Sequence, residues 1–147
     1  MKPSGFSDMT ATVEYIDHTG DTGILVTADT PQQVFTTAAK CMFHIICPSK
    51  ACHHNLSYAI KLQGQGFEQL LVDWLSELNF LFQTESFLLA EVNDFLIRDN
   101  TLTARVSGEK LDTTLHNIHT EIKAVTWHNL YLKPVNGKWQ AQVIFDI

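Results

Sequence analysis

The sequence is poor in basic residues, in cysteine and in long apolar runs, and each shortage excludes a class of protein. Ten Lys and Arg residues against sixteen Asp and Glu residues give a formal net charge of -6, and no basic stripe is present. Such a chain is poorly suited to holding a nucleic-acid backbone across a broad surface, so we expect no strong direct nucleic-acid binding. A role near nucleic acid would then run through a protein partner or a bound cation.

The cysteine count and the apolar runs indicate a cellular compartment. Cys41, Cys47 and Cys52 are an odd number in a chain of 147 residues, which is long enough to need no covalent staples. This favours a reducing compartment. The first ten residues lack the apolar core of a signal peptide, and no apolar run approaches the roughly 18 residues of a membrane span. We therefore expect a cytoplasmic protein that does not cross a membrane.

Ready-made catalytic and nucleotide-binding motifs are also missing. The sequence contains no P-loop, no G-x-G-x-x-G fingerprint and no Gly-x-Ser-x-Gly nucleophile elbow. Cys47, Cys52, His53 and His54 cluster in sequence, but they lack the paired, well-separated ligands of a structural zinc site. We therefore expect no metal site here, and we expect the adjacent histidines to be solvated in a polar loop, 49–54.

Hydrophobic periodicity predicts an α+β fold. Residues 1–10 are polar and unpatterned, which indicates a flexible tail, and residues 11–147 are expected to form a single domain. Thr30 and Pro31 signal the start of a first helix, and apolar spacing of three and four residues predicts a second. The element order is β-β-α-β-α-β-β-β-β, with mostly antiparallel β-sheet and two packed helices. The expected strands cover 11–17, 22–28, 56–62, 87–98, 102–107, 121–134 and 138–147, and the expected helices 31–46 and 67–82.

Asp21 is the first candidate for a functional residue. It closes a compact turn, His18-Thr19-Gly20-Asp21, between two predicted strands. An aspartate at such a position is commonly a turn device, because its side chain accepts a backbone N–H. A carboxylate held between two strands can also bind a cation, although the turn by itself favours the first role. The turn alone is therefore weak evidence for a cation site.

Asp146 is the second candidate. It stands in an apolar, strand-like run at the end of the sequence, so we expect burial on at least one face, and a buried carboxylate requires a cation or several donors. Lys123 or His128 would supply an ion pair. A hard divalent ion would serve as well if Asp21 folds against Asp146 and the α-carboxylate of Ile147, because like charges at close range oppose one another's ionisation. Oxygen ligands favour Ca²⁺, Mg²⁺ or Mn²⁺ over zinc.

Lys123 is the third candidate. It lies in the predicted strand 121–134, where alternation places it on the same face as Val125 and Trp127, and His128 on the other face. Its side chain would either extend past apolar neighbours to water or serve as a held cation beside carboxylates or a phosphate. Both interpretations remain open.

Several segments together resemble the archease family, over about residues 11–147. The chain departs from the family pattern at three positions. Gly20 replaces alanine, which loosens the turn, Thr22 replaces an aliphatic residue, and Trp127 replaces tyrosine, which loses a hydroxyl. The segments that carry the resemblance are Tyr15–Asp21, Leu70–Leu78, Gly108-Glu109, Glu121–His128 and Val143–Ile147.

The resemblance implies a function. Archeases assist the RtcB-type RNA ligase in tRNA splicing and RNA repair, by promoting guanylylation of the ligase so that it turns over repeatedly, and are not enzymes themselves. The metal-binding positions of the family correspond to Asp21, Asp146 and Ile147. Lys123 matches a basic position of the family, and His18 belongs to the same motif as Asp21. The resemblance thus implies a cytoplasmic, cation-binding activator whose partner is an RNA ligase.

Two other functions fit the same carboxylates. One is a free-standing, divalent-metal-dependent hydrolase, which would need an open coordination site and a base such as His128. The other is a chaperone-like scaffolding protein in which the carboxylates are purely structural. The hydrolase would turn over without a partner, and the scaffold would bind no metal.

Overall fold

The computed structural model describes residues 11–49 and 53–147, with only the backbone of His18. The predicted tail, 1–10, and Cys52 lie outside the described residues. The elements in chain order are β1 (Thr12–His18), β2 (Asp21–Ala28), α1 (Pro31–Ile46), β3 (Leu56–Gln63), α2 (Phe67–Glu85), β4 (Phe87–Arg98), β5 (Thr101–Lys110), β6 (Ala124–Val125), β7 (Tyr131–Val135) and β8 (Lys138–Asp146).

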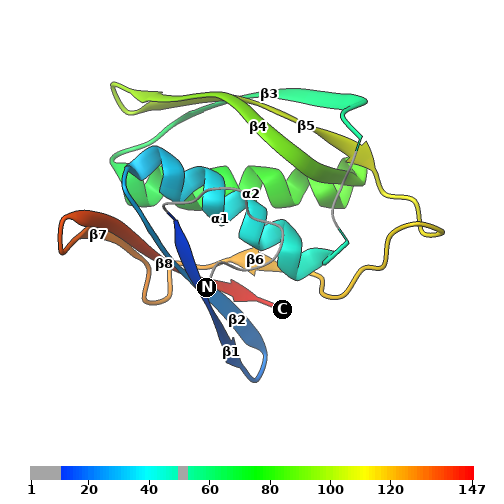
Figure 1. The fold of residues 1–147 in the computed structure, drawn as a ribbon, viewed down its shortest axis with the longest axis horizontal. Helices are drawn as coiled ribbons and strands as arrows, with labels where there is room; N and C mark the ends of the chain where they lie inside the picture. Colours follow the sequence, from blue (N-terminus) through cyan, green and yellow to red (C-terminus); the bar gives the residue numbers. More distant parts are fainter. Residues whose placement is uncertain (1–10, 50–52) are drawn as a thin grey trace.

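The two helices lie between two sheets (Figure 1). One sheet has five strands in the order β1-β2-β8-β6, with β7 also paired to β8, and the other has three in the order β3-β5-β4. Every strand pair in the described part of the chain is antiparallel. The prediction of an α+β fold with two helices on mostly antiparallel sheet is therefore confirmed. The division into two sheets is an additional finding.

Local signals in the sequence account for the position of α1. Thr30 Oγ1 accepts a hydrogen bond from the Gln33 N–H at 3.2 Å, and Pro31 occupies the first turn, as predicted. The helices are tied together by Trp74 of α2, which is fully buried and whose indole N–H donates to the Phe35 carbonyl at 3.0 Å. The core thus lies on both sides of the helix layer. None of the helices described is long and apolar enough to span a membrane.

The predicted strand 121–134 is wrong, because it is two strands. Between the pairs Val125–Phe145 and Tyr131–Gln142, five residues, 126–130, oppose only two of β8. At the start of the break, the N–H and the hydroxyl of Thr126 both donate to the Ile144 carbonyl, at 3.0 and 2.8 Å. The backbone then leaves the sheet before β7 begins.

The break also changes which side chains share a face. Trp127 is 57% exposed, His128 is exposed, and Asn129 adopts a positive φ of 52°. The predicted grouping of Trp127 with Lys123 and Val125 therefore does not hold, because strand alternation ends at β6.

A glycine in β5 provides a test of the three-stranded sheet. A Cβ at Gly108 would lie 1.9 Å from the Leu88 carbonyl oxygen, and this backbone atom has no room to move. We expect Gly108→Ala to lower the free energy of unfolding by about 3 kcal/mol or more, measured by urea denaturation at equilibrium. Gly64→Ala is the control, because its Cβ would meet only side chains, at 3.3 to 3.4 Å. Equal effects of the two substitutions would show that the β4–β5 register differs from the one described.

Candidate functional site

Asp21 and Asp146 lie directly opposite each other in the β2–β8 pair. Directly opposed residues of an antiparallel pair share one face of the sheet, with Cβ atoms about 5 Å apart. Two like charges in this arrangement destabilise the sheet. The structure therefore brings together the two carboxylates that the sequence singled out, and their arrangement calls for a positive charge beside them.

This pair lies on the face of the five-stranded sheet that points away from the helices. The neighbouring pair, Thr22 and Phe145, is buried, and alternation puts Asp21 and Asp146 on the opposite face. Asp146 is exposed, so the expectation that it is buried was wrong. Apolar neighbours along a strand indicate burial of the alternate face only.

Asp21 differs from Asp146 in that part of it is buried. Its Oδ1 atom is inaccessible and has no hydrogen-bond partner among the described residues. The role of a turn device, in which the carboxylate accepts a backbone N–H, is therefore not seen at this oxygen. Because burying a carboxylate oxygen without a partner is costly, the atom fits a ligand of a hard cation.

Three other predicted site residues, His18, Lys123 and Ile147, lie at the same end of the sheet. The backbone of His18 pairs with Asp21, although the His18 side chain lies outside what the structure describes. The Lys123 N–H donates to the Asp146 carbonyl at 2.7 Å, and the Ile147 N–H donates to the Gly20 carbonyl at 3.3 Å. Four strands thus contribute to one row of residues across the sheet.

The expected ion pair of Asp146 is absent from the described part of the chain. Lys123 and His128 are both exposed, and neither forms a salt bridge with Asp146 there. Within the same residues, no three His, Cys, Asp or Glu side chains gather into a metal-binding group. A cation at Asp21 and Asp146 would therefore need further oxygens, from the Ile147 carboxylate, backbone carbonyls, water or a partner.

The sequence matches a family model described as the Archease protein family (MTH1598/TM1083) over residues 13–147. The chain belongs to the archease family. It is 38% identical to protein archease of Methanosarcina barkeri, over 91% of this chain and 94% of that protein. It is 34% identical to protein archease of Methanopyrus kandleri, with 91% and 98% covered.

Solved structures of archease-family proteins have the same fold. The solution structure of Methanobacterium thermoautotrophicum protein 1598 has a TM-score of 0.78 and 29% identity, covering 92% of this chain and 98% of that one. The crystal structure of a Thermotoga maritima archease, described as a possible chaperone, has a TM-score of 0.63 and 16% identity, with 90% and 94% covered. At this low identity the second likeness shows the fold alone.

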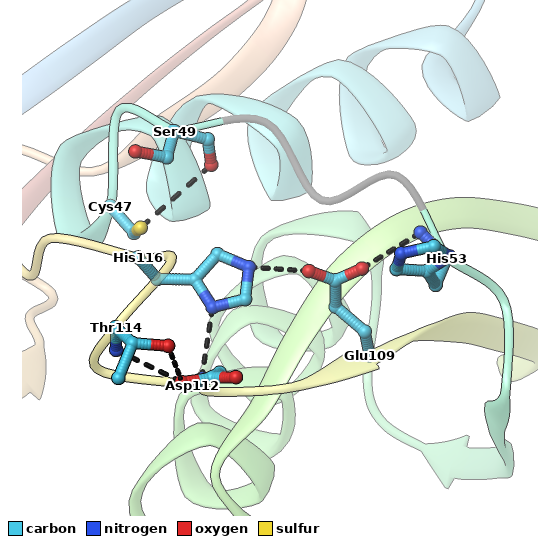
Figure 2. A network of polar contacts seen from close by, with 7 residues as sticks. All are labelled: Cys47, Ser49, His53, Glu109, Asp112, Thr114 and His116. Atoms are coloured by element: carbon cyan, nitrogen blue, oxygen red, sulfur yellow. Dashed lines mark hydrogen bonds and ion pairs between the residues drawn. The ribbon is translucent and has the colours of Figure 1, made fainter.

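This archease-family chain also contains a buried carboxylate–imidazole pair, Glu109 and His116, which are 6% and 8% exposed (Figure 2). The Asp112 N–H donates to His116 Nδ1 at 2.9 Å, so this nitrogen carries no proton and the proton lies on Nε2. Nε2 in turn donates to Glu109. The other oxygen of Glu109 accepts the His53 N–H at 2.8 Å. Neither ring nitrogen is left for acid–base chemistry, so the pair holds the connection after β5 in place.

Two further groups, Asp112 and Cys41, have a shifted pKa. Hydrogen bonds from the Thr114 hydroxyl (2.7 Å) and N–H (2.9 Å) hold the pKa of Asp112 below its ordinary value. Burial raises the pKa of the Cys41 thiol to about 12, so Cys41 remains a neutral thiol at physiological pH and is not a nucleophile. Cys47 is buried, and its thiol lies 3.7 Å from the Ser49 carbonyl oxygen.

No local pattern in the sequence indicated the Glu109–His116 pair. His116 lies in a polar connection without periodicity, and only the Gly108-Glu109 segment of the archease resemblance marked this region. The bond between Glu109 and His53 spans 56 residues, a separation that no local pattern reports.

Replacing Glu109 tests whether this pair is structural. In Glu109→Gln, an amide NH₂ would face either His116 Nε2–H or the His53 N–H, which places two buried donors against each other. We expect the free energy of unfolding to fall by about 2 kcal/mol, measured by urea denaturation. Glu91→Gln is the matched control, since Glu91 also faces a histidine, at 3.5 Å, but is 53% exposed, and it should change stability by less than about 0.5 kcal/mol. A Glu109→Gln protein as stable as the control would contradict the structural role.

Proposed function

We propose that this protein is a cation-carrying accessory protein of an RtcB-type RNA ligase, acting in the cytoplasm in tRNA splicing and RNA repair. It promotes guanylylation and multiple turnover of the ligase and performs no catalysis alone. Membership of the archease family supports this role. The observation that carries it is the direct opposition of Asp21 and Asp146, with one buried carboxylate oxygen of Asp21 left without a partner among the described residues.

Asp21, Asp146 and the α-carboxylate of Ile147 are the proposed ligands of a divalent cation, which would be Ca²⁺, Mg²⁺ or Mn²⁺. When bound, the ion would supply positive charge that neutralises the opposed carboxylates and polarises a phosphate oxygen. Strand pairing holds Asp21 and Asp146 in fixed register. Lys123 lies one residue before the partner of Asp146 in β6, and its exposed side chain is available to a phosphate of the partner.

The charge of the chain supports a partner with a basic surface. A net charge of -6 favours approach to a phosphate-binding active site, which is itself basic, and disfavours free RNA. Among the described residues, His116 and Cys41 most resemble catalytic groups. Both ring nitrogens of His116 are engaged in hydrogen bonds, and the raised pKa of Cys41 keeps its thiol neutral. This supports placing the chemistry on the ligase.

Metal binding can be tested by calorimetric titration with Ca²⁺, Mg²⁺ and Mn²⁺. We expect the parent to bind at least one of these ions, and Asp21→Asn and Asp146→Asn each to weaken binding by about tenfold or more, or about 1.4 kcal/mol. A one-glycine extension after Ile147 should weaken it as well. Glu14→Gln is the control, because Glu14 is exposed and pairs with uncharged Leu25.

Thermal unfolding gives an independent reading of the same site. Without divalent ions, Asp21→Asn should be as stable as the parent or more so by about 0.5 kcal/mol, because the like-charge opposition is relieved. With the ion, stability rises by RT ln(1 + [L]/Kd), so the parent should gain clearly more than Asp21→Asn. An equal gain in the parent and in Asp21→Asn would rule out this metal site.

The partner role can be tested by ligation under multiple-turnover conditions. We expect the cognate ligase to complete more turnovers with the protein than without it, and Asp21→Ala and Asp146→Ala to abolish most of this stimulation. Unchanged stimulation by both variants would exclude the metal-centred mechanism. Metal-dependent turnover of phosphoesters by the protein alone would instead identify a hydrolase, and suppressed aggregation of the ligase without any effect on guanylylation would identify a scaffold.

A further inference from the structure

Two amide side chains of α2 hold a single carbonyl group next to the Asp21–Asp146 row. Asn79 Nδ2 donates to the Ile122 carbonyl oxygen at 2.9 Å, and Gln83 Nε2 donates to the same oxygen at 3.0 Å. Asn79 and Gln83 are four residues apart, so they lie one above the other on the helix. Ile122 is fully buried, and its carbonyl is thus held by two donors.

The same peptide unit is also held at its other end. The N–H of the Ile122–Lys123 peptide belongs to Lys123, and it donates to the Asp146 carbonyl at 2.7 Å. Because a peptide unit is planar, fixing its oxygen to α2 and its nitrogen to β8 fixes its orientation. The Cα atom of Lys123 lies in the same plane, so these three hydrogen bonds fix the point from which its side chain leaves the backbone.

An amide side chain at position 79 contributes little to stability compared with an apolar one. It is 5% exposed, and its Oδ1 atom is buried without a hydrogen-bond partner among the described residues. Its helix neighbours Leu75 and Leu78 are fully buried. An apolar residue at this position would avoid the unpaired oxygen, and the Ile122 carbonyl would retain Gln83 as a donor. An unsatisfied buried group of this kind calls for a reason other than packing.

The location of Asn79 supplies that reason. In the described part of the chain, only two buried side-chain atoms lack a partner, Asp21 Oδ1 and Asn79 Oδ1. One belongs to the proposed cation site, and the other to the residue that holds the peptide beside it.

We propose that Asn79 is a positioning residue, which acts through the Ile122–Lys123 peptide to orient Lys123 beside Asp146. This inference rests on the proposed function, because orienting Lys123 matters only if Lys123 meets a phosphate of the partner. Asn79 itself touches neither the cation nor the partner. Its removal should therefore affect stimulation of the ligase, not affinity for the cation.

The test is Asn79→Leu, with Gln69→Leu as the matched control. Gln69 is also an amide of α2 bonded to a backbone group, the Gln65 N–H, at 3.2 Å, in the turn that precedes the helix. We expect Asn79→Leu to keep or raise the melting temperature, and to speed hydrogen exchange of the Lys123 amide about tenfold while the β2 amides are unchanged. Gln69→Leu should not affect the Lys123 amide.

Ligase stimulation supplies the functional readout. We expect Asn79→Leu to reduce stimulation about threefold or more at unchanged cation affinity, and to add nothing in a Lys123→Ala background, as for residues that act in series. Additive effects of the two substitutions, or unchanged exchange at Lys123, would overturn the proposal. Parallel losses of stability, exchange protection and stimulation would overturn it too, because they identify a purely structural residue.

Failure of the proposed function and failure of the positioning role of Asn79 give different results. Absence of stimulation by the parent protein would overturn the proposed function and with it the positioning role, even where exchange at Lys123 responds to Asn79→Leu. Stimulation by the parent that Asn79→Leu leaves intact would overturn the positioning role alone.

Discussion

The antiparallel pairing of β2 with β8 is the constraint on which the rest of the structure depends. Ile24 and Val143 form one directly opposed pair, and both are fully buried against the helix layer. A slip of one residue would turn every inward side chain of β8 to solvent, so hydrophobic burial locks the register. The same register places Asp21 opposite Asp146. The core thus places two like charges opposite each other, an arrangement that the two residues would not adopt by themselves.

Buried polar groups in this protein follow two different patterns. Glu109 and His116 are surrounded by partners, and the hydrogen bond from the Asp112 N–H settles where the imidazole proton lies. Such a pair is costly to break and serves the fold. Asp21 and Asn79 each retain a buried oxygen without a partner among the described residues, and both belong to the region around the end of β8. The satisfied groups fix the architecture, and the two unsatisfied ones are the observations on which the proposed cation site and the proposed role of Asn79 rest.

The sequence was sufficient for features that depend on local periodicity. The start of α1 at Thr30–Pro31, the α+β class and the antiparallel pairing all follow from spacing, caps and turns. The sequence was not sufficient for features that depend on a residue far away along the chain. The sequence did not indicate the break after β6, where the Thr126 hydroxyl bonds the Ile144 carbonyl, 18 residues away. The helical pattern of α2 likewise does not indicate that Asn79 bonds Ile122, 43 residues away. Asp146 could be singled out by residue type, but its exposure depends on which face of β8 meets the helices.

The order of the elements along the chain has a consequence for how the protein folds. β8 is the last described element in sequence, yet it lies inside the five-stranded sheet and pairs with β2, β6 and β7. The pair Asp21–Asp146 joins residues 125 positions apart (146 minus 21), and contacts of such separation form late, because a long loop must first close. The β1–β2 hairpin can form early, but its Asp21 does not face a second carboxylate until β8 pairs with β2. The pair Asp21–Asp146 therefore exists only in molecules in which β8 has joined the sheet. Binding of a ligand to this pair would thus report that folding is complete.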